Sequence, residues 1–376
     1  MDKIKKVLEI ISKNKLNVAL ISSVSNIIYL TGYSGFSYFE REAFLLISKV
    51  VQPQAQPQGL KHKTTGVYGY ILTDGRYSEA VAKIPHFKLL EISNNNSLED
   101  ILKLLSKNIN KLGIEENNIS FSESKKLKKY FKLIPLKDLE NLRIVKEKSE
   151  VLKIQKACQI GDETFDFILK KIRFGISEKE LALELEYFIK KNRADISFPP
   201  IVAFGKNSSI PHHQTSNEKL RTNNIVLLDF GVKFENYCSD MTRTVFFGKA
   251  DGKFKKIYRT VLESQQKAIE FLQRVGPSKG SDPQGKKVDY VTRNYIINQG
   301  FPTIPHSLGH GIGIEVHESP RLSPKSKDIL KTGMVFSIEP GIYIPNYGGV
   351  RIEDLVTIQK NKPELLTHSP KNLIEI

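Results

Sequence analysis

The segment IVLLDFGVKFENYCSDMTRTVFF, residues 225–247, restricts the fold more than any other stretch of this chain. It has the pattern of two strands joined by a short polar turn, and the strands carry Asp229 and Asp240 among residues typical of a sheet core. Side chains alternate along a strand, so Asp240, Thr242 and Thr244 share one face, and the neighbouring strand can bring Asp229 beside them. Two buried carboxylates this close repel each other, and one would be protonated unless a cation lies nearby. The hairpin therefore predicts a sheet that carries a cation site.

Further candidate ligands lie in three short downstream segments. PHSLGHGIGIEVHESP holds three histidines, MVFSIEPGIYIP holds a glutamate inside an apolar strand pattern, and GGVRIEDLVTI holds an arginine and a glutamate on one strand face. Each of these residues alone is more often a surface, core or salt-bridged side chain. Together with the hairpin they supply four carboxylates and a glycine-flanked imidazole, which suit a pair of first-row divalent ions better than a cysteine-rich structural zinc. The candidates are Asp229, Asp240, His306, His310, His317, Glu339, Arg351 and Glu353.

The remaining sequence divides into two parts with different patterns. Up to about residue 138, short strand patterns alternate with helix patterns, which predicts an α/β domain. From residue 139 on, long helix patterns lie on either side of the hairpin, which predicts an α+β domain with an antiparallel sheet. The Pro- and Gln-rich residues 50–66 and the loop around Gly280 predict exposed connections that lie outside the candidate site.

Charge and cysteine content bear on partners and compartment. The chain has 57 lysines and arginines against 41 aspartates and glutamates, a formal net charge of +16, which suits an acidic partner such as nucleic acid. However, the densest basic run, residues 123–132, fits the solvated side of a helix, and we predict no nucleic-acid partner. No run of about 18 apolar residues and no signal-peptide pattern is present, so we predict no membrane partner. Only Cys158 and Cys238 occur, which predicts a reduced, cytoplasmic protein.

Five ordered segments resemble the creatinase/aminopeptidase family, the pita-bread metallopeptidases, and within it the Xaa-Pro peptidases. They are FPPIVAFGKNSSIPHH, LLDFGVKFENYCSDMTRT, HSLGHGIGIEVHE, FSIEPGIYIP and GGVRIEDLVTI. IIYLTGYSGF and ILTDGRY resemble the N-terminal domain of the family, so the resemblance covers nearly the whole chain. It implies a creatinase-like α/β domain at residues 1–138 and an α+β pita-bread catalytic domain with an antiparallel sheet at residues 139–376.

Carried over residue by residue, the resemblance implies two divalent metal ions per chain. Asp240 and Glu353 would bridge the ions, Asp229 would complete one, and His310 and Glu339 would complete the other. Manganese is the expected metal, with Co²⁺, Zn²⁺ or Fe²⁺ as alternatives that a carboxylate-rich site accepts.

The resemblance also implies roles for residues around the ions. His212 matches a substrate-side histidine, and the PH pair favours it over the adjacent His213. His317 matches a histidine that stabilises the tetrahedral intermediate, and Glu339 is placed to move a proton from the nucleophile to the leaving nitrogen.

Two further residues are expected to support the site without touching the ions. Arg351 resembles an arginine that lies behind the ligands, and Thr242 is expected to hydrogen-bond Asp240. His306 is expected to be structural, because it matches no ligand of the family.

The implied reaction is that of a metallo-exopeptidase acting on peptides with proline at the second position. The Xaa-Pro bond lacks an N–H and has a fixed φ, so a dedicated pocket is expected. We expect an Xaa-Pro aminopeptidase that forms a homodimer. An Xaa-Pro dipeptidase, or prolidase, is the alternative, and the sequence does not separate the two.

Three other functions compete with this one. A non-catalytic binding protein of the same fold would have lost ligands, and a creatinase-type enzyme works without the metals, whereas all five ligand types are present here. A methionine aminopeptidase shares the catalytic domain, but the N-terminal domain of this chain argues against it.

Overall fold

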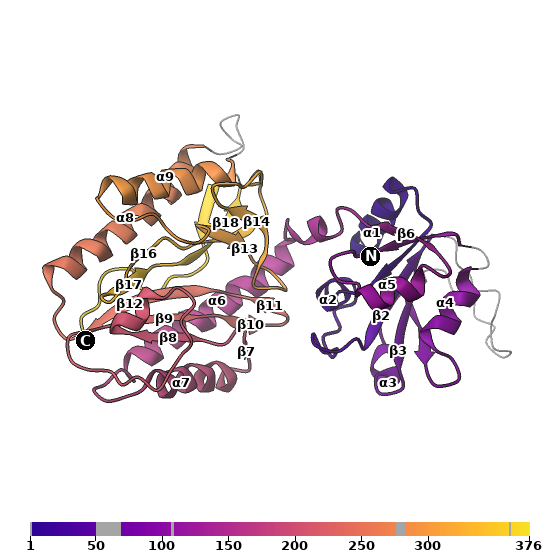
Figure 1. Ribbon diagram of the computed structural model, residues 1–376, viewed down its shortest axis with the longest axis horizontal. Helices are drawn as coiled ribbons and strands as arrows, with labels where there is room; N and C mark the ends of the chain where they lie inside the picture. The colour runs from indigo at the N-terminus through magenta and orange to yellow at the C-terminus, as the bar shows by residue number, and fades with distance from the viewer. Residues whose placement is uncertain (1, 50–68, 107–108, 276–282, 361) are drawn as a thin grey trace. The chain divides into compact units, whose positions relative to one another are not determined.

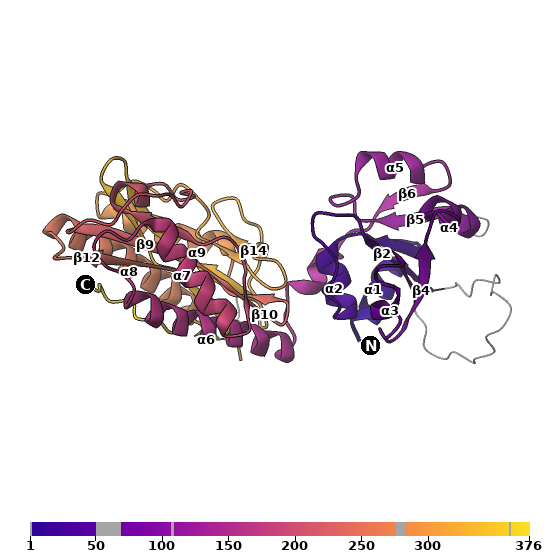
Figure 2. The same ribbon diagram turned by 90° about the horizontal axis from the view of Figure 1, so that it is seen from below.

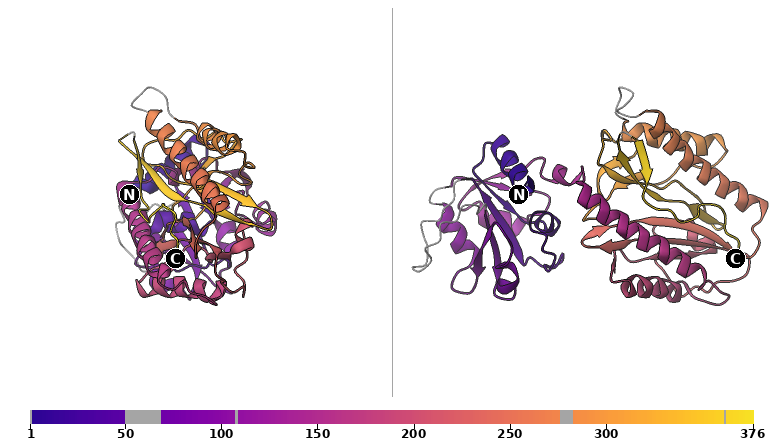
Figure 3. Two further views of the ribbon diagram at one scale, coloured as in Figure 1. Left: turned by 90° about the vertical axis from the view of Figure 1, so that its left-hand side faces the viewer. Right: turned by 180° about the vertical axis from the view of Figure 1, so that it is seen from behind.

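The computed structural model divides into two compact units, Met1–Leu142 and Arg143–Ile376 (Figure 1). Figures 2 and 3 show the same units from other sides. The predicted domain limits, 1–138 and 139–376, stay predictions, and residues 50–66 and the segment around Gly280 lie outside the described part of the chain. The structure describes residues 2–49, 69–106, 109–275, 283–360 and 362–376.

The first unit is a mixed six-stranded sheet in the order β4-β3-β2-β1-β5-β6. The three strands β1 to β3 pair antiparallel, whereas β4, β5 and β6 each join the sheet in parallel pairs. Every residue of β1 is buried, as in a strand with both faces covered, and this confirms the predicted α/β class. The elements are α1 Asp2–Lys13, β1 Val18–Ile21, α2 Val24–Thr31, β2 Ala43–Ser48, β3 Gly69–Asp74, α3 Ser78–Val81, β4 Phe87–Ile92, α4 Leu98–Ser106, β5 Lys111–Ile114, α5 Phe121–Leu127 and β6 Lys132–Pro135.

The helix predicted across the basic run 123–132 is shorter than expected. It starts at a Ser120 cap that bonds Glu123 in a capping box, and it ends at Leu127. After Leu127 the chain turns to enter β6. Phe131 is buried, and it belongs to this turn and not to the helix.

The second unit packs two helix pairs against antiparallel sheets. Helices α6 and α7 share an apolar core with β8, β9, β10 and β12, while α8 and α9 share one with the later strands. In Figure 1, α8 and α9 accordingly lie above the strands and α7 lies below them. A capping box of Ser177 and Glu180 starts α7. The helices are α6 Lys148–Leu169, α7 Glu178–Lys191, α8 Gly252–Arg274 and α9 Gly285–Asn298, with 3-10 turns η1 Glu140–Arg143 and η2 Gly205–Ser209.

The named strands of the second unit all pair antiparallel, which confirms the predicted sheet, and a single parallel bridge joins Phe246 to Glu375. The orders are β12-β9-β8, β11-β10-β7, β14-β13-β15-β18-β19 and β16-β17. Within the described ranges, no helix has both the length and the apolar character needed to cross a membrane. The strands are β7 Asp195–Ile196, β8 Ile201–Phe204, β9 Asn224–Phe230, β10 Val232–Phe234, β11 Tyr237–Cys238, β12 Met241–Phe247, β13 Gly309–Gly311, β14 Glu318–Leu322, β15 Val335–Ile338, β16 Gly341–Ile344, β17 Gly348–Arg351, β18 Asp354–Gln359 and β19 Lys362–Leu365.

The hairpin at residues 225–247 differs from the prediction, because each of its strands is broken in two. The breaks lie at Gly231 and at Ser239–Asp240, so β9 and β12 pair in one sheet while β10 and β11 pair in another. A Cβ at Gly231 would lie 2.1 Å from Ser239 O, so only glycine allows this close approach. Val232 N donates to Ser239 Oγ at 3.0 Å, which closes the break. Asp240 therefore lies directly before the first residue of β12.

Candidate metal centre

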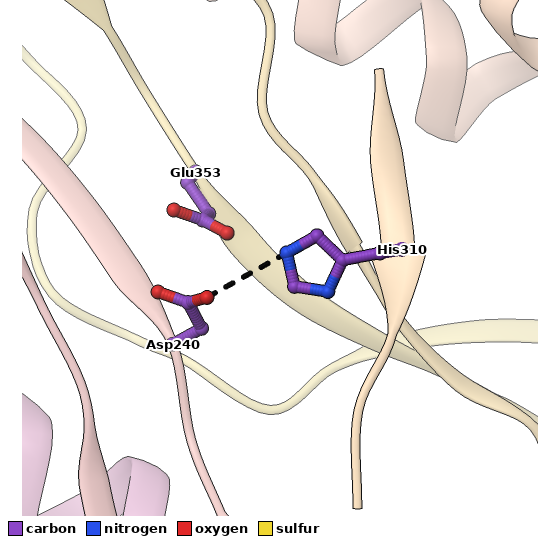
Figure 4. A group of neighbouring side chains, drawn as sticks. All are labelled: Asp240, His310 and Glu353. Atoms are coloured by element: carbon purple, nitrogen blue, oxygen red, sulfur yellow. Dashed lines mark ion pairs between the residues drawn. The ribbon is translucent and has the colours of Figure 1, made fainter. Parts of the chain in front are cut away.

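Three buried side chains that lie far apart in the sequence converge on one point. Asp240 precedes β12, His310 is the middle residue of β13, and Glu353 lies between β17 and β18. One ligand atom of each lies within 4.8 Å of the other two (Figure 4). His310 Nε2 is 3.6 Å from Asp240 Oδ2 and 3.4 Å from Glu339 Oε1, so Glu339 extends the cluster. The structure thus brings together four of the five predicted ligands, and Asp229 joins them through Arg351, as described below.

Gly309 and Gly311 position His310, the predicted histidine ligand. A Cβ at Gly309 would lie 2.0 Å from Ser337 O, and one at Gly311 would lie 2.1 Å from Ser319 O. Only glycines on either side of His310 therefore let β13 lie this close to its neighbours. The backbone N–H of His310 donates to Ser337 Oγ at 3.0 Å, which anchors the residue.

Backbone hydrogen bonds place the two glutamates. Glu339 N donates to Leu308 O at 2.8 Å, and Glu353 N donates to Thr242 O at 3.1 Å. Glu339 does not lie inside a strand as the sequence suggested. It follows the last residue of β15 and precedes Pro340, which cannot donate to a ladder, so the strand ends there.

The carboxylates of this cluster are short of counter-charge. Asp240 Oδ1 and Glu353 Oε1 are buried, and neither has a hydrogen-bond partner among the residues that the structure describes. Burial, and after it the charge of Glu353, raises the pKa of Asp240 and of Glu339 well above the usual range. Burial and the charge of Asp229 raise the pKa of Glu353 to about 8.

Arg351 is the cation that faces these carboxylates. It donates through Nη2 to Asp229 Oδ2 at 2.5 Å, through Nε to Thr242 Oγ1 at 3.0 Å and through Nη1 to Tyr343 Oη at 2.9 Å. Burial still raises the pKa of Asp229, and Arg351 only opposes the rise. The expected hydrogen bond from Thr242 to Asp240 is wrong: Thr242 Oγ1 donates to Glu353 Oε2 at 2.7 Å, because β12 lies beside the residues that follow β17.

This donor set fits divalent cations. Four ionised carboxylates opposed by one guanidinium would leave three negative charges in a buried site, which is costly without bound cations. Two orphaned carboxylate oxygens and a nearby imidazole are the groups that first-row divalent ions bind. Burial lowers the pKa of His310 to about 3, so its ring stays neutral, which is the form that ligates metals.

Three further histidines lie around the cluster. His317 is exposed, and its ring centroid is 4.4 Å from that of His310. His212 is also exposed, and its charge and that of His317 lower the pKa of Asp229, so both lie within electrostatic reach of the site. His306 was expected to be only structural, but the structure places it at the edge of the site. Its Nε2 is 2.8 Å from Tyr343 Oη and its Nδ1 is 4.0 Å from Glu339 Oε2.

Sequence reasoning missed Tyr343 and Glu178. Tyr343 is buried and connects His306 to Arg351. It lies in the strand pattern GIYIP, which directly follows Glu339 and Pro340, and this nearness in the sequence is the signal that could have found it. Glu178 is buried and lies 2.8 Å from His213 Nε2, but its position at the start of a helix gives no sign of this contact.

Comparison with known proteins is consistent with this geometry. Residues 152–360 match metallopeptidase family M24, and residues 3–145 match the creatinase/prolidase N-terminal domain. The chain is 33% identical to the Xaa-Pro dipeptidase of Pyrococcus horikoshii over 99% of both chains.

Two solved structures are similar over nearly their full length. The Xaa-Pro dipeptidase from Bacillus anthracis has a TM-score of 0.87 and 34% identity, covering 100% of this chain and 99% of that one. The X-Pro aminopeptidase from Thermotoga maritima has a TM-score of 0.79 and 30% identity, covering 96% of this chain and 97% of that one.

Proposed function

The chain belongs to metallopeptidase family M24, and from that membership we propose that it is an Xaa-Pro dipeptidase with two divalent metal ions. The observation that carries the proposal is the buried cluster of Asp240, His310 and Glu353, with its two orphaned carboxylate oxygens. The proposed ligands are Asp229, Asp240, His310, Glu339 and Glu353.

The dipeptidase replaces the aminopeptidase that the sequence alone favoured. The similar proteins named Xaa-Pro dipeptidase have identities of 33% and 34%, and the solved one has a TM-score of 0.87. The X-Pro aminopeptidase has a lower identity, 30%, and a lower TM-score, 0.79. Its similarity still spans most of the chain, so the aminopeptidase remains the second candidate.

When bound, the divalent ions would act as Lewis acids toward the substrate carbonyl and would acidify a water molecule. The carboxylate-rich ligand set accepts several first-row metals, and Mn²⁺ is our first choice because of the family resemblance. The protein would supply the remaining chemistry through residues at the edge of the cluster.

Glu339 is the proposed proton carrier. Its Oε1 accepts from Ser337 Oγ at 3.2 Å, while Oε2 is directed toward His306. Its carboxylate would take a proton from the attacking water molecule and pass it to the prolyl nitrogen as the peptide bond breaks.

Two exposed histidines are proposed to act on the substrate. His317 would donate an N–H to the oxyanion that develops on the scissile carbonyl. His212 would help to hold the substrate. Arg351 would not touch the substrate, since its guanidinium already orients Asp229, Thr242 and Tyr343.

The experiment is a side-by-side assay of an Xaa-Pro dipeptide and an Xaa-Pro-Yaa tripeptide, with protein stripped by chelation and reloaded with Mn²⁺. We expect faster cleavage of the dipeptide and loss of activity after chelation. Preference for the tripeptide would select the aminopeptidase. No metal-dependent cleavage of either peptide would remove the peptidase proposal.

We also propose that the protein works as a homodimer in the cytoplasm. The family resemblance supports the dimer, and two buried free cysteines, Cys158 and Cys238, support a reducing compartment. Light scattering of the purified protein tests the dimer, because a monomer mass would contradict it.

A further inference from the structure

Glu178, the first residue of α7, has a buried carboxylate that accepts hydrogen bonds from several residues of one loop. Its Oε1 accepts from Phe204 N and Asn207 Nδ2, each at 2.8 Å. Its Oε2 accepts from Ser216 N at 2.8 Å and Ser216 Oγ at 2.6 Å, and it lies 2.8 Å from His213 Nε2. All these partners lie in residues 204–216, which connect β8 to the segment before β9 and include His212.

The side chain of Glu178 is not needed to start its own helix. Ser177 and Glu180 already form the capping box of α7 in both directions. A buried carboxylate is costly unless donors surround it. Here burial raises the pKa of Glu178, but hydrogen bonds from Ser216, Asn207 and His213 outweigh burial and leave the pKa below its usual value. The contacts of Glu178 therefore serve the loop.

The opposite side of the same loop lies against the metal centre. Gly349 N, in β17, donates to Ser208 Oγ at 2.8 Å, and a Cβ at Gly349 would lie 2.3 Å from Ser208 O. Arg351 Nη1 lies 3.4 Å from Pro211 O, and the same guanidinium holds Asp229. The loop is thus fixed at Pro211 by the site and at His213 by Glu178. His212 stands between these two anchors with its side chain exposed.

We propose that Glu178 and His213 are positioning residues for substrate binding. They hold loop 205–216 so that His212 faces the metal centre, and they act on the substrate only through His212. This inference rests on the proposed function, because it assumes that His212 contacts the peptide. It assigns a role to His213, the second histidine of IPHH. The sequence distinguished it from His212 only because His212 directly follows the proline.

The first test is a double-mutant cycle with Glu178→Gln and His212→Ala, using the Mn²⁺-loaded full chain and an Xaa-Pro dipeptide. A glutamine amide keeps one acceptor oxygen, so it cannot serve both groups of donors. We expect Glu178→Gln to raise KM at least tenfold while kcat changes less than threefold. In the His212→Ala background the same change should alter kcat/KM less than twofold. Equal losses in both backgrounds, or an unchanged KM, would overturn the proposal.

The second test does not depend on activity. In ¹³C-histidine NMR of the full chain, the ring signal of His212 is identified by its loss in His212→Ala. We expect Glu178→Gln and the milder His213→Gln to shift or broaden this signal. The matched control is Ile189→Ala, which removes a buried side chain at the other end of α7 and should leave it unchanged.

The two tests separate this inference from the proposed function. An inactive wild-type protein would remove the peptidase proposal, while the His212 signal would still report whether Glu178 positions the loop. An unchanged signal in both Glu178→Gln and His213→Gln would overturn the positioning role even in an active enzyme. Should Glu178→Gln fail to fold, His213→Gln carries the same test, since it leaves the carboxylate with its other donors.

Discussion

Glu353 and Asp354 are neighbours in the chain and are both buried, yet their surroundings are opposite. Asp354 Oδ1 accepts from Arg243 Nη2 at 2.6 Å, and Lys371 Nζ lies 2.9 Å from Oδ2. Burial raises the pKa of Asp354, but these two cations outweigh burial and leave it below its usual value. Glu353 has one hydrogen bond, from Thr242, no ion pair among the described residues, and a pKa raised to about 8.

This difference separates a structural carboxylate from one that awaits a ligand. The chain supplies two cations to Asp354, so the fold can neutralise a buried carboxylate where neutrality is needed. At Glu353 it supplies only other carboxylates and Arg351, which is already held by Asp229. The missing positive charge at Glu353 is therefore the charge that metal ions would bring.

The largest expected effect is the loss of activity on substitution of Glu353, which has no ion pair in the described part of the chain. We predict that Glu353→Gln lowers kcat/KM by more than about 100-fold, since changing a partner behind a ligand already costs roughly 10–100-fold. The metal-free protein should not lose stability near neutral pH, because a pKa of about 8 leaves the Glu353 carboxyl group protonated and glutamine is neutral as well. Kinetics, metal analysis and urea unfolding after chelation measure these effects. If Glu353→Gln bound as much metal as the wild type, Glu353 would not be a metal ligand and its contrast with Asp354 would be wrong.

The matched substitution at the carboxylate with two ion pairs is Asp354→Asn. We predict a loss of about 3–5 kcal/mol in the free energy of unfolding, because the buried Arg243 and the partly buried Lys371 lose their counter-charge. The folded fraction should keep its Mn²⁺ and most of its kcat. Urea unfolding measures the loss, and a variant as stable as the wild type would show that the ion pair contributes little.

In metal-free protein, Glu353 and Asp354 should make the free energy of unfolding depend on pH in opposite directions. The folded pKa of Glu353 is raised from 4.5 to about 8, so its stabilising contribution is present below 4.5 and is lost as pH rises toward 8. The folded pKa of Asp354 lies below 3.8, so its contribution is present above 3.8 and is lost as pH falls through the folded value. Urea unfolding between pH 3 and 9 tests both signs, and Glu353→Gln should flatten only the alkaline slope.

A smaller effect is expected from Thr242→Val. Thr242 donates to Glu353 and not to Asp240, so the change should weaken Mn²⁺ binding by about 10–100-fold through Glu353. Titration calorimetry measures the affinity. In a Glu353→Gln background the same substitution should add little, and a full additional loss there would contradict the assigned hydrogen bond.

The sequence predicted the fold classes and the candidate ligand residues because their signals are local, whereas the family resemblance implied that these ligands meet in one site. Strand alternation put Asp240 and Thr242 on one face, and the glycines beside His310 marked its strand. Contacts distant in the chain gave no such signal. The pairing of Glu178 with His213 spans 35 residues, and that of Thr242 with Glu353 spans 111. Alternation also could not show that the hairpin breaks at Gly231 and at Ser239–Asp240, because packing between sheets sets those breaks.

The most direct test of the account is a calorimetric titration of chelator-treated protein with Mn²⁺ at pH 7 in buffers of different ionisation enthalpy. Because the unoccupied cluster keeps protons on its carboxyl groups, we predict saturation at two ions per chain, with protons released to the buffer as metal binds. Absence of saturable binding, or binding without proton release, would contradict the claim that buried, uncompensated carboxylates form a metal centre.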